Sequence, residues 1–190
     1  MCANKVETKN KRLAQLPNTI TGFRIVGSVV LLFVQPLSTA FYILYTLCGV
    51  SDVADGFLAR RLKVTGELGE RLDSVADLLF YAVMLRHIIP FLVPRVPVSV
   101  WYCVGGLVLL RLFSYVYANV KYHRFPTLHT YANKFTGALV FLVPYLLLIA
   151  PPTPVSWVTC AVCAVSSAEE LLIHLRAKKY PTGVKTIFSV

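Results

Sequence analysis

The sequence predicts an all-α, polytopic membrane protein with six transmembrane helices and a short N-terminal amphipathic segment. Hydrophobic residues make up 56% of its 190 residues, and the mean hydropathy is +0.65. Charged residues make up only 15%, whereas soluble domains carry roughly 25%. Apolar runs recur along nearly the whole chain, and only helices satisfy the backbone of such runs inside a bilayer. We therefore expect one membrane domain, residues 20–176, between polar ends at 1–19 and 177–190.

The N-terminal segment is polar and basic. Its four cations are Lys5, Lys9, Lys11 and Arg12. Apolar residues lie between them, which is typical of a short amphipathic helix on a membrane surface. For residues 1–8 a disordered basic tail is an equal alternative. A helix start is then expected at Pro17-Asn18-Thr19, because the first apolar run follows at once.

Six apolar runs follow, and each approaches the roughly 20 residues that cross ~30 Å of hydrocarbon. The expected spans cover residues 20–37, 39–59, 72–92, 98–120, 135–150 and 155–175. Pro36 closes the first of them, and a proline-rich turn precedes the last. Polar connections at 60–71 and 121–134 separate the second span from the third and the fourth from the fifth.

The positive charge is distributed unevenly between the two predicted sides of the membrane. An even number of spans places both termini on one side. The N-terminal segment, the connections at 60–71 and 121–134, and the residues after the sixth span (176–190) hold fifteen of the nineteen lysine and arginine residues. Basic loops are retained in the cytoplasm, so we expect both termini on the cytoplasmic side of the membrane. The net charge of +10 then indicates contact with anionic lipids, and no nucleic-acid-binding motif is present.

All four aspartates of the protein lie within residues 52–77. Asp52 and Asp55 end the second span, and Asp73 and Asp77 begin the third. Spacings of three and four place each pair on one face of a helix. Converging carboxylates at the edge of a membrane repel one another unless cations bind them. Oxygen ligands favour Mg²⁺ or Mn²⁺, so the sequence predicts a divalent-metal site.

Simpler explanations exist for the residues around the acids. The aspartates could form ion pairs with the cations of the adjoining connection, which are Arg60, Arg61, Lys63 and Arg71. The small residues Gly56, Ala59 and Gly69 could serve close helix packing alone, or could leave room for a flat ligand. Neither explanation by itself requires four aspartates at this spacing.

The motif resembles the signature of a known family. It reads Asp52-x-x-Asp55-Gly56-x-x-Ala59-Arg60, then eight residues, then Gly69-x-x-x-Asp73-x-x-x-Asp77. This resembles the CDP-alcohol phosphotransferases, and in particular bacterial members that are similar to phosphatidylglycerophosphate synthases. Pro17-Asn18, Thr21 and Arg24 are similar to the segment that leads into the first helix of those members. Six helices, with the motif across the second and third, also match that family.

The resemblance implies an activity and a role for each motif residue. An alcohol would be joined to the lipid phosphate of CDP-diacylglycerol, with release of CMP. Two divalent ions would be held by Asp52, Asp55, Asp73 and Asp77. Asp77 would also be the general base, and the nucleotide would be bound by Gly56, Ala59, Arg60 and Gly69. A homodimer is expected from the same resemblance.

The acceptor alcohol is less clearly indicated than the reaction. An anionic acceptor such as glycerol 3-phosphate needs a basic pocket, for which the candidates are Arg111, Lys121, Arg124 and Lys134. Arg111 lies inside a span and needs a partner or a ligand, and a structural salt bridge to Glu169 or Glu170 is an equal alternative. His123 and His129 are more typical of ordinary interfacial residues. Arg24 would face the phosphates or reach to the interface.

Among the possible acceptor alcohols, glycerol 3-phosphate is slightly favoured over inositol, inositol phosphate and serine. Phosphatidylglycerophosphate synthases often carry Asp-Pro-x-Ala-Asp-Lys, whereas Ser74 and Leu78 stand at the corresponding positions here. The Asp-Ser-x-Ala-Asp form also occurs in serine-accepting relatives. From a different class, a divalent-cation transporter would use the four acids as its pathway. Such a transporter would be expected to carry acids near the middle of the membrane, which this sequence does not.

Overall fold

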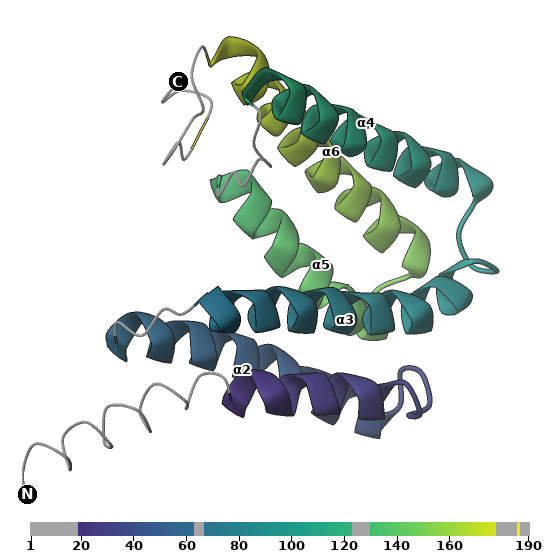
Figure 1. Cartoon of the computed structure of the whole chain (residues 1–190). Helices are drawn as coiled ribbons and strands as arrows, with labels where there is room; N and C mark the ends of the chain where they lie inside the picture. The colour runs from purple at the N-terminus through teal and green to yellow at the C-terminus, as the bar shows by residue number, and fades with distance from the viewer. Residues whose placement is uncertain (1–18, 63–66, 123–129, 178–185, 187–190) are drawn as a thin grey trace, which may run out of the picture. The chain divides into compact units, whose positions relative to one another are not determined.

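A computed structural model describes residues 19–62, 67–122, 130–177 and 186, and these residues form helices joined by turns and short irregular segments. An apolar helix covers Thr19–Leu31. It is followed by α2 (Thr39–Leu62), α3 (Glu67–Leu92), α4 (Val98–Tyr122), α5 (Tyr131–Ile149) and α6 (Pro152–Arg176). The all-α prediction is confirmed for these residues (Figure 1). The predicted N-terminal amphipathic segment and the C-terminal tail lie outside them, apart from residues 19, 177 and 186.

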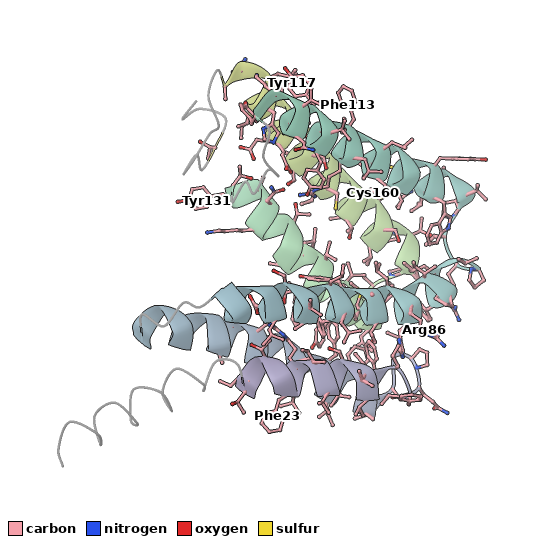
Figure 2. All side chains as sticks on the ribbon, viewed as in Figure 1. Phe23, Arg86, Phe113, Tyr117, Tyr131 and Cys160 are labelled. Carbon is pink, nitrogen blue, oxygen red and sulfur yellow. The ribbon has the colours of Figure 1, made fainter. Side chains whose placement is uncertain are left out.

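Four of these helices are long and apolar enough to cross a membrane: Leu72–Leu92 within α3, and α4, α5 and α6. This indicates an integral membrane protein. The apolar parts before them, Thr19–Leu31 and Thr39–Ala54, are shorter. Many large apolar side chains point outward, such as Phe23 on the first helix and Phe113 on α4, which are 72% and 59% exposed (Figure 2). Such surfaces suit contact with lipid.

Several predicted boundaries are corrected by the structure. The first helix ends at Leu31 and not at residue 37, because turns follow it and Pro36 cannot donate a helical hydrogen bond. Leu37 has a positive φ of 56°. The connection predicted at 60–71 is shorter, since α2 continues to Leu62 and α3 begins at Glu67. Arginine, leucine and glutamate there are good helix formers, so the helices extend past the apolar stretch.

The starts of α5 and α6 also differ from the prediction, for local reasons. The buried Thr130 caps α5, and its hydroxyl accepts a hydrogen bond from the backbone N–H of Asn133 at 3.2 Å. The cap adds a turn before the apolar run predicted from residue 135. Helix α6 begins at Pro152, where a proline costs no hydrogen bond and its φ is already helical.

The chain divides into two compact units, Met1–Phe91 and Leu92–Val190. In the first unit α2 and α3 are antiparallel neighbours. Phe41 stacks on Tyr45 with ring centroids 5.4 Å apart, and Tyr45 stacks on Phe80 of α3 at 4.9 Å. Phe41 also contacts His87 of α3, with ring centroids 5.4 Å apart. These aromatic contacts fix the register that brings the aspartates of α2 and α3 together.

The first helix packs against α2 at a glycine. A Cβ at Gly27 would lie 2.7 Å from Sγ of Cys48, which is closer than real Cβ contacts allow. The close approach therefore depends on Gly27. His87 of α3 contacts the turn after the first helix, where its Nε2 lies 3.1 Å from the carbonyl oxygen of Val34. The first helix thus packs against α2, and the turn after it contacts α3.

In the second unit α6 packs against both α4 and α5. Val96, Val100 and Cys160 form a buried apolar cluster at one end, with Trp101 and Leu107 packed against it. The opposite end is more polar, and it contains the second cluster of functional candidates.

Candidate active site

Three of the four aspartates converge on one point in the first unit. Asp52 lies on α2, and Asp73 and Asp77 lie one turn apart on α3. One carboxylate oxygen from each lies within 4.8 Å of the others. Their side chains are each about half exposed, at 48%, 47% and 46%. The convergence predicted from the helix spacing is therefore present for these three acids.

A buried arginine from the first helix lies against this cluster. The Arg24 side chain is only 1% exposed, and its guanidinium forms ion pairs with Asp52 through Nη1 and with Asp73 through Nη2. Nη1 also lies 3.4 Å from Oδ1 of Asp77. The hydroxyl of Ser28 donates to the Arg24 carbonyl oxygen at 2.8 Å. Arg24 therefore connects the first helix to both α2 and α3 through the acids.

The donor set fits a divalent metal ion. All three groups are carboxylates, so the cluster offers only hard oxygen ligands. Mg²⁺ and Mn²⁺ prefer such ligands, and one ion can be shared by carboxylates that converge from two helices. The half-exposed side chains leave the cluster open for an ion to enter. Asp52, Asp73 and Asp77 are therefore suitable ligands for such an ion.

The other predicted motif residues are only partly covered by the structure. Gly56 on α2 and Gly69 on α3 are partly buried. The side chains of Asp55, Ala59 and Arg60 lie outside the described part of the chain. The same holds for Arg61, Lys63 and Arg71, which were the alternative ion-pair partners. Within the described residues, the cation at the acids is Arg24 of a different helix.

A second polar cluster, which we call the Arg111 cluster, lies in the second unit and consists of Arg111, Asn133, Ser166 and Glu170. Nη2 of Arg111 donates to Oδ1 of Asn133 at 2.8 Å and lies 3.2 Å from Oε2 of Glu170. Asn133 donates to the same Glu170 oxygen at 3.2 Å, and Ser166 donates to Asn133 at 2.6 Å. Glu170 is 2% exposed, whereas the Arg111 side chain is 32% exposed.

Arg111 thus has the salt bridge that the sequence left as an alternative, and its partner is Glu170. The arginine is held on one side only. Its Nε donates to the Tyr115 hydroxyl at 3.2 Å and its Nη2 to the cluster. Among the described residues no hydrogen bond is recorded for Nη1, which can donate two more. A guanidinium that is anchored on one side and one-third exposed on the other can bind an anion without losing its buried partner.

Lys121, one of the predicted acceptor residues, lies at the end of α4 and contacts the end of α6. Its Nζ donates to the carbonyl oxygens of His174 at 2.6 Å and Leu175 at 3.3 Å. The Tyr122 hydroxyl lies 3.2 Å from the carbonyl oxygen of His174 and 3.0 Å from that of Ala177, and it can donate to one of them. The last carbonyls of α6 lack helical partners, so the end of α4 caps them. Lys134 is exposed on α5, while Arg124, His123 and His129 lie outside the described residues.

Two features of these sites were missed by sequence reasoning. The sequence offered the phosphates or the interface for Arg24, and the structure pairs it with three aspartates. An arginine within an apolar helix signals that a partner exists but does not say which one. Asn133 and Ser166 were not considered, because an isolated amide or hydroxyl in a membrane helix carries no signal until its neighbours are known.

The comparisons with known proteins agree on one family. The CDP-alcohol phosphatidyltransferase family model matches residues 14–168. A CDP-diacylglycerol--glycerol-3-phosphate 3-phosphatidyltransferase of Wigglesworthia glossinidia brevipalpis is 35% identical over 100 residues, which is 50% of this chain and 52% of that protein. A protein of the same name from Sodalis glossinidius is 40% identical over 75 residues, 37% of this chain and 41% of that protein. The chain thus spans about half the length of the curated relatives it matches. No solved structure matches it significantly.

Proposed function

The chain belongs to the CDP-alcohol phosphatidyltransferase family, and from this premise we propose that it transfers a phosphatidyl group from CDP-diacylglycerol to a small alcohol and releases CMP. The observation that carries the proposal is the carboxylate cluster of Asp52, Asp73 and Asp77, in which α2 and α3 present converging oxygens. These are three of the four aspartates in the motif through which the sequence resembles the family. The enzyme would act in phospholipid synthesis.

The chemistry assigns separate tasks to the motif residues. The alcohol oxygen attacks the lipid phosphorus and forms a new P–O bond, while the bond to the bridging oxygen of the diphosphate breaks and CMP leaves. Asp77 accepts the alcohol proton, because an alcohol is a poor nucleophile at neutral pH. Asp52, Asp55, Asp73 and Asp77 would hold two Mg²⁺ or Mn²⁺ ions, which supply charge neutralisation at the diphosphate. For the nucleotide we propose Gly56, Ala59, Arg60 and Gly69.

Glycerol 3-phosphate is the acceptor that we propose first. Both curated relatives are named for it. The one-sided anchoring of Arg111 supports an anionic acceptor, since Nη1 has donors to offer and the side chain is 32% exposed. Lys121, Arg124 and Lys134 are the further proposed acceptor residues. Inositol, inositol phosphate and serine are the alternatives, and Ser74 beside Asp73 keeps serine among them.

The membrane arrangement that we propose has six helices and an N-terminal amphipathic segment at residues 1–19. Four long apolar helices support it directly. The shorter helix at Thr19–Leu31 rises about 20 Å, and the turns after it would complete its passage. The excess of basic residues in the terminal segments and in the two connections favours a cytoplasmic location for both termini and for the acids. A homodimer surrounded by anionic lipid completes the proposal.

A divalent-cation transporter is the competing hypothesis, and two observations count against it. The family match covers residues 14–168 and therefore includes all four aspartates. The converging acids lie on α2 and at the start of the apolar part of α3, Leu72–Leu92. A transport pathway would need acids further along the span.

The proposal is tested by CMP release from the purified full chain in detergent with CDP-diacylglycerol and Mg²⁺ or Mn²⁺. Glycerol 3-phosphate, inositol, inositol phosphate and serine are supplied one at a time, and the lipid product is identified by mass. We expect release with glycerol 3-phosphate and its loss in Asp77→Asn. Leu78→Ala is the matched control, because Leu78 is the neighbouring residue on α3 and is 73% exposed. Absence of release with every acceptor would contradict the transferase, and undiminished release by Asp77→Asn would contradict the role of Asp77.

A further inference from the structure

We propose that Arg24 is the positioning residue of the metal site. It orients the carboxylates from their buried side, and it remains in place when divalent ions bind from the solvent side. The inference rests on the proposed metal-binding function and goes beyond it. Arg24 contacts three acids on two helices, and it does so from a third helix that contributes none of the acids. Arg24 therefore links the three helices at this point.

The exposure of the groups separates the two faces of the cluster. Arg24 is 1% exposed, whereas the three carboxylates that it contacts are each close to half exposed. The guanidinium therefore lies on the protein side of the acids, and an ion can approach from the solvent side. An ion that arrives from outside does not have to displace a cation that is buried beneath the ligands.

The bonding capacity of the groups allows both contacts at once. Arg24 contacts Oδ1 of each of the three aspartates. A carboxylate has two oxygens and about four lone-pair positions, so it can accept from arginine and bind a metal together. A planar guanidinium fixes the directions of two carboxylates at the same time, which a single ammonium cannot do. Metal-binding carboxylates are commonly oriented by such hydrogen bonds.

Two effects of removing Arg24 have opposite signs, and this makes the proposal testable. Coulomb repulsion between Arg24 and a divalent ion predicts tighter metal binding when the arginine charge is removed. Loss of orientation predicts weaker binding, by about 10- to 100-fold for groups behind metal ligands. If Arg24 only neutralises the acids in place of a metal ion, its removal should make metal binding tighter. If Arg24 positions the ligands, its removal should make metal binding weaker.

The experiment measures Mn²⁺ affinity directly, through the signal of free Mn²⁺ in electron paramagnetic resonance, with the purified full chain in detergent and no substrate present. We expect Arg24→Gln to bind Mn²⁺ at least tenfold more weakly than the wild type, and Arg24→Lys to be intermediate. Arg86→Gln removes one charge from an exposed position farther along α3 (Figure 2). Val83→Ala loosens a side chain of the same unit that is 2% exposed. Both controls should bind as the wild type does.

Each result has a defined meaning. Unchanged or tighter binding by Arg24→Gln overturns the positioning role while leaving the metal site intact. Weakening by Val83→Ala to the same extent shows that loss of packing alone explains the effect, and this also overturns it. If Arg24→Gln does not fold, Arg24→Lys decides, and wild-type affinity in that variant contradicts the proposal. If the wild type fails to bind Mn²⁺, or Asp77→Asn binds equally well, the proposed metal site itself fails.

Discussion

Replacing Arg111 and Glu170 singly and together separates the structural role of this ion pair from a role in acceptor binding. The two partners differ in burial, because Glu170 is 2% exposed and Arg111 is 32% exposed. Arg111→Gln leaves a buried carboxylate without its cation. Glu170→Gln leaves an arginine that is already partly exposed to solvent. We therefore expect the first substitution to be the more destabilising one.

The magnitudes follow from the contacts. Removal of one partner from a fully buried pair costs about 3–5 kcal/mol, and the exposure of Arg111 reduces this to about 2–3 kcal/mol for Arg111→Gln. Glu170→Gln keeps an oxygen that can accept from Arg111 and Asn133, so we expect about 1 kcal/mol. In a protein of this size 1 kcal/mol corresponds to roughly 2–4 °C in Tm. The double variant should be less destabilised than Arg111→Gln alone, because no buried charge is left unpaired.

The assay is thermal unfolding of the purified variants in one detergent at one scan rate, since membrane proteins commonly unfold irreversibly. Additive losses in the double variant would refute the coupling between the two charges. CMP release then tests the acceptor role. If Arg111 binds glycerol 3-phosphate, the double variant regains stability but still shows a KM for this acceptor at least tenfold higher. Recovery of both stability and KM would show that Arg111 is structural only.

Three further predictions concern packing, capping and metal. Gly27→Ala should lower Tm by several degrees, corresponding to about 1–3 kcal/mol of overpacking against Cys48. Gly22→Ala is the control and should not lower Tm, because a Cβ there meets nothing within 4 Å. Equal effects of the two substitutions would contradict the close approach at Gly27. Lys121→Met should cost about 1 kcal/mol in thermal unfolding, because two carbonyl oxygens at the end of α6 lose their donor; an unchanged Tm would show that water replaces the lysine at no cost. Chelation with EDTA should abolish CMP release and lower Tm, with recovery on adding Mg²⁺ or Mn²⁺; activity that persists in EDTA would argue against metal-dependent transfer.

Much of the fold was predictable because the signals for it are local. Apolar runs of membrane length predicted helices whose observed boundaries differ by a few residues in most cases. The largest error was the first span, which ends at Leu31 and not at residue 37. Turns replace the helix there, and hydropathy does not distinguish an apolar turn from an apolar helix. The error at the start of α5 has a similar source, because the cap at Thr130 depends on one side-chain hydrogen bond.

The sequence by itself determined the family and the helical class, and it predicted that the acids of each helix lie on one face. Spacings of three and four residues act within one helix, so they can be interpreted without knowing how helices pack. The family prediction is confirmed by the match over residues 14–168. The motif also predicted that the acids of two successive helices would meet, and Asp52, Asp73 and Asp77 do so.

Only the tertiary structure decided which cations accompany the acids. Arg24 contacts aspartates that lie 28 and 49 residues away, and Arg111 contacts Glu170 over 59 residues. The cations nearest in the sequence lie outside the described side chains, and among the described residues the cation that contacts the aspartates is Arg24 of a separate helix. Helix periodicity fixes the face on which a residue lies, but the neighbour opposite that face depends on the packing of whole helices. That packing is set by contacts such as Tyr45 on Phe80 and Gly27 on Cys48.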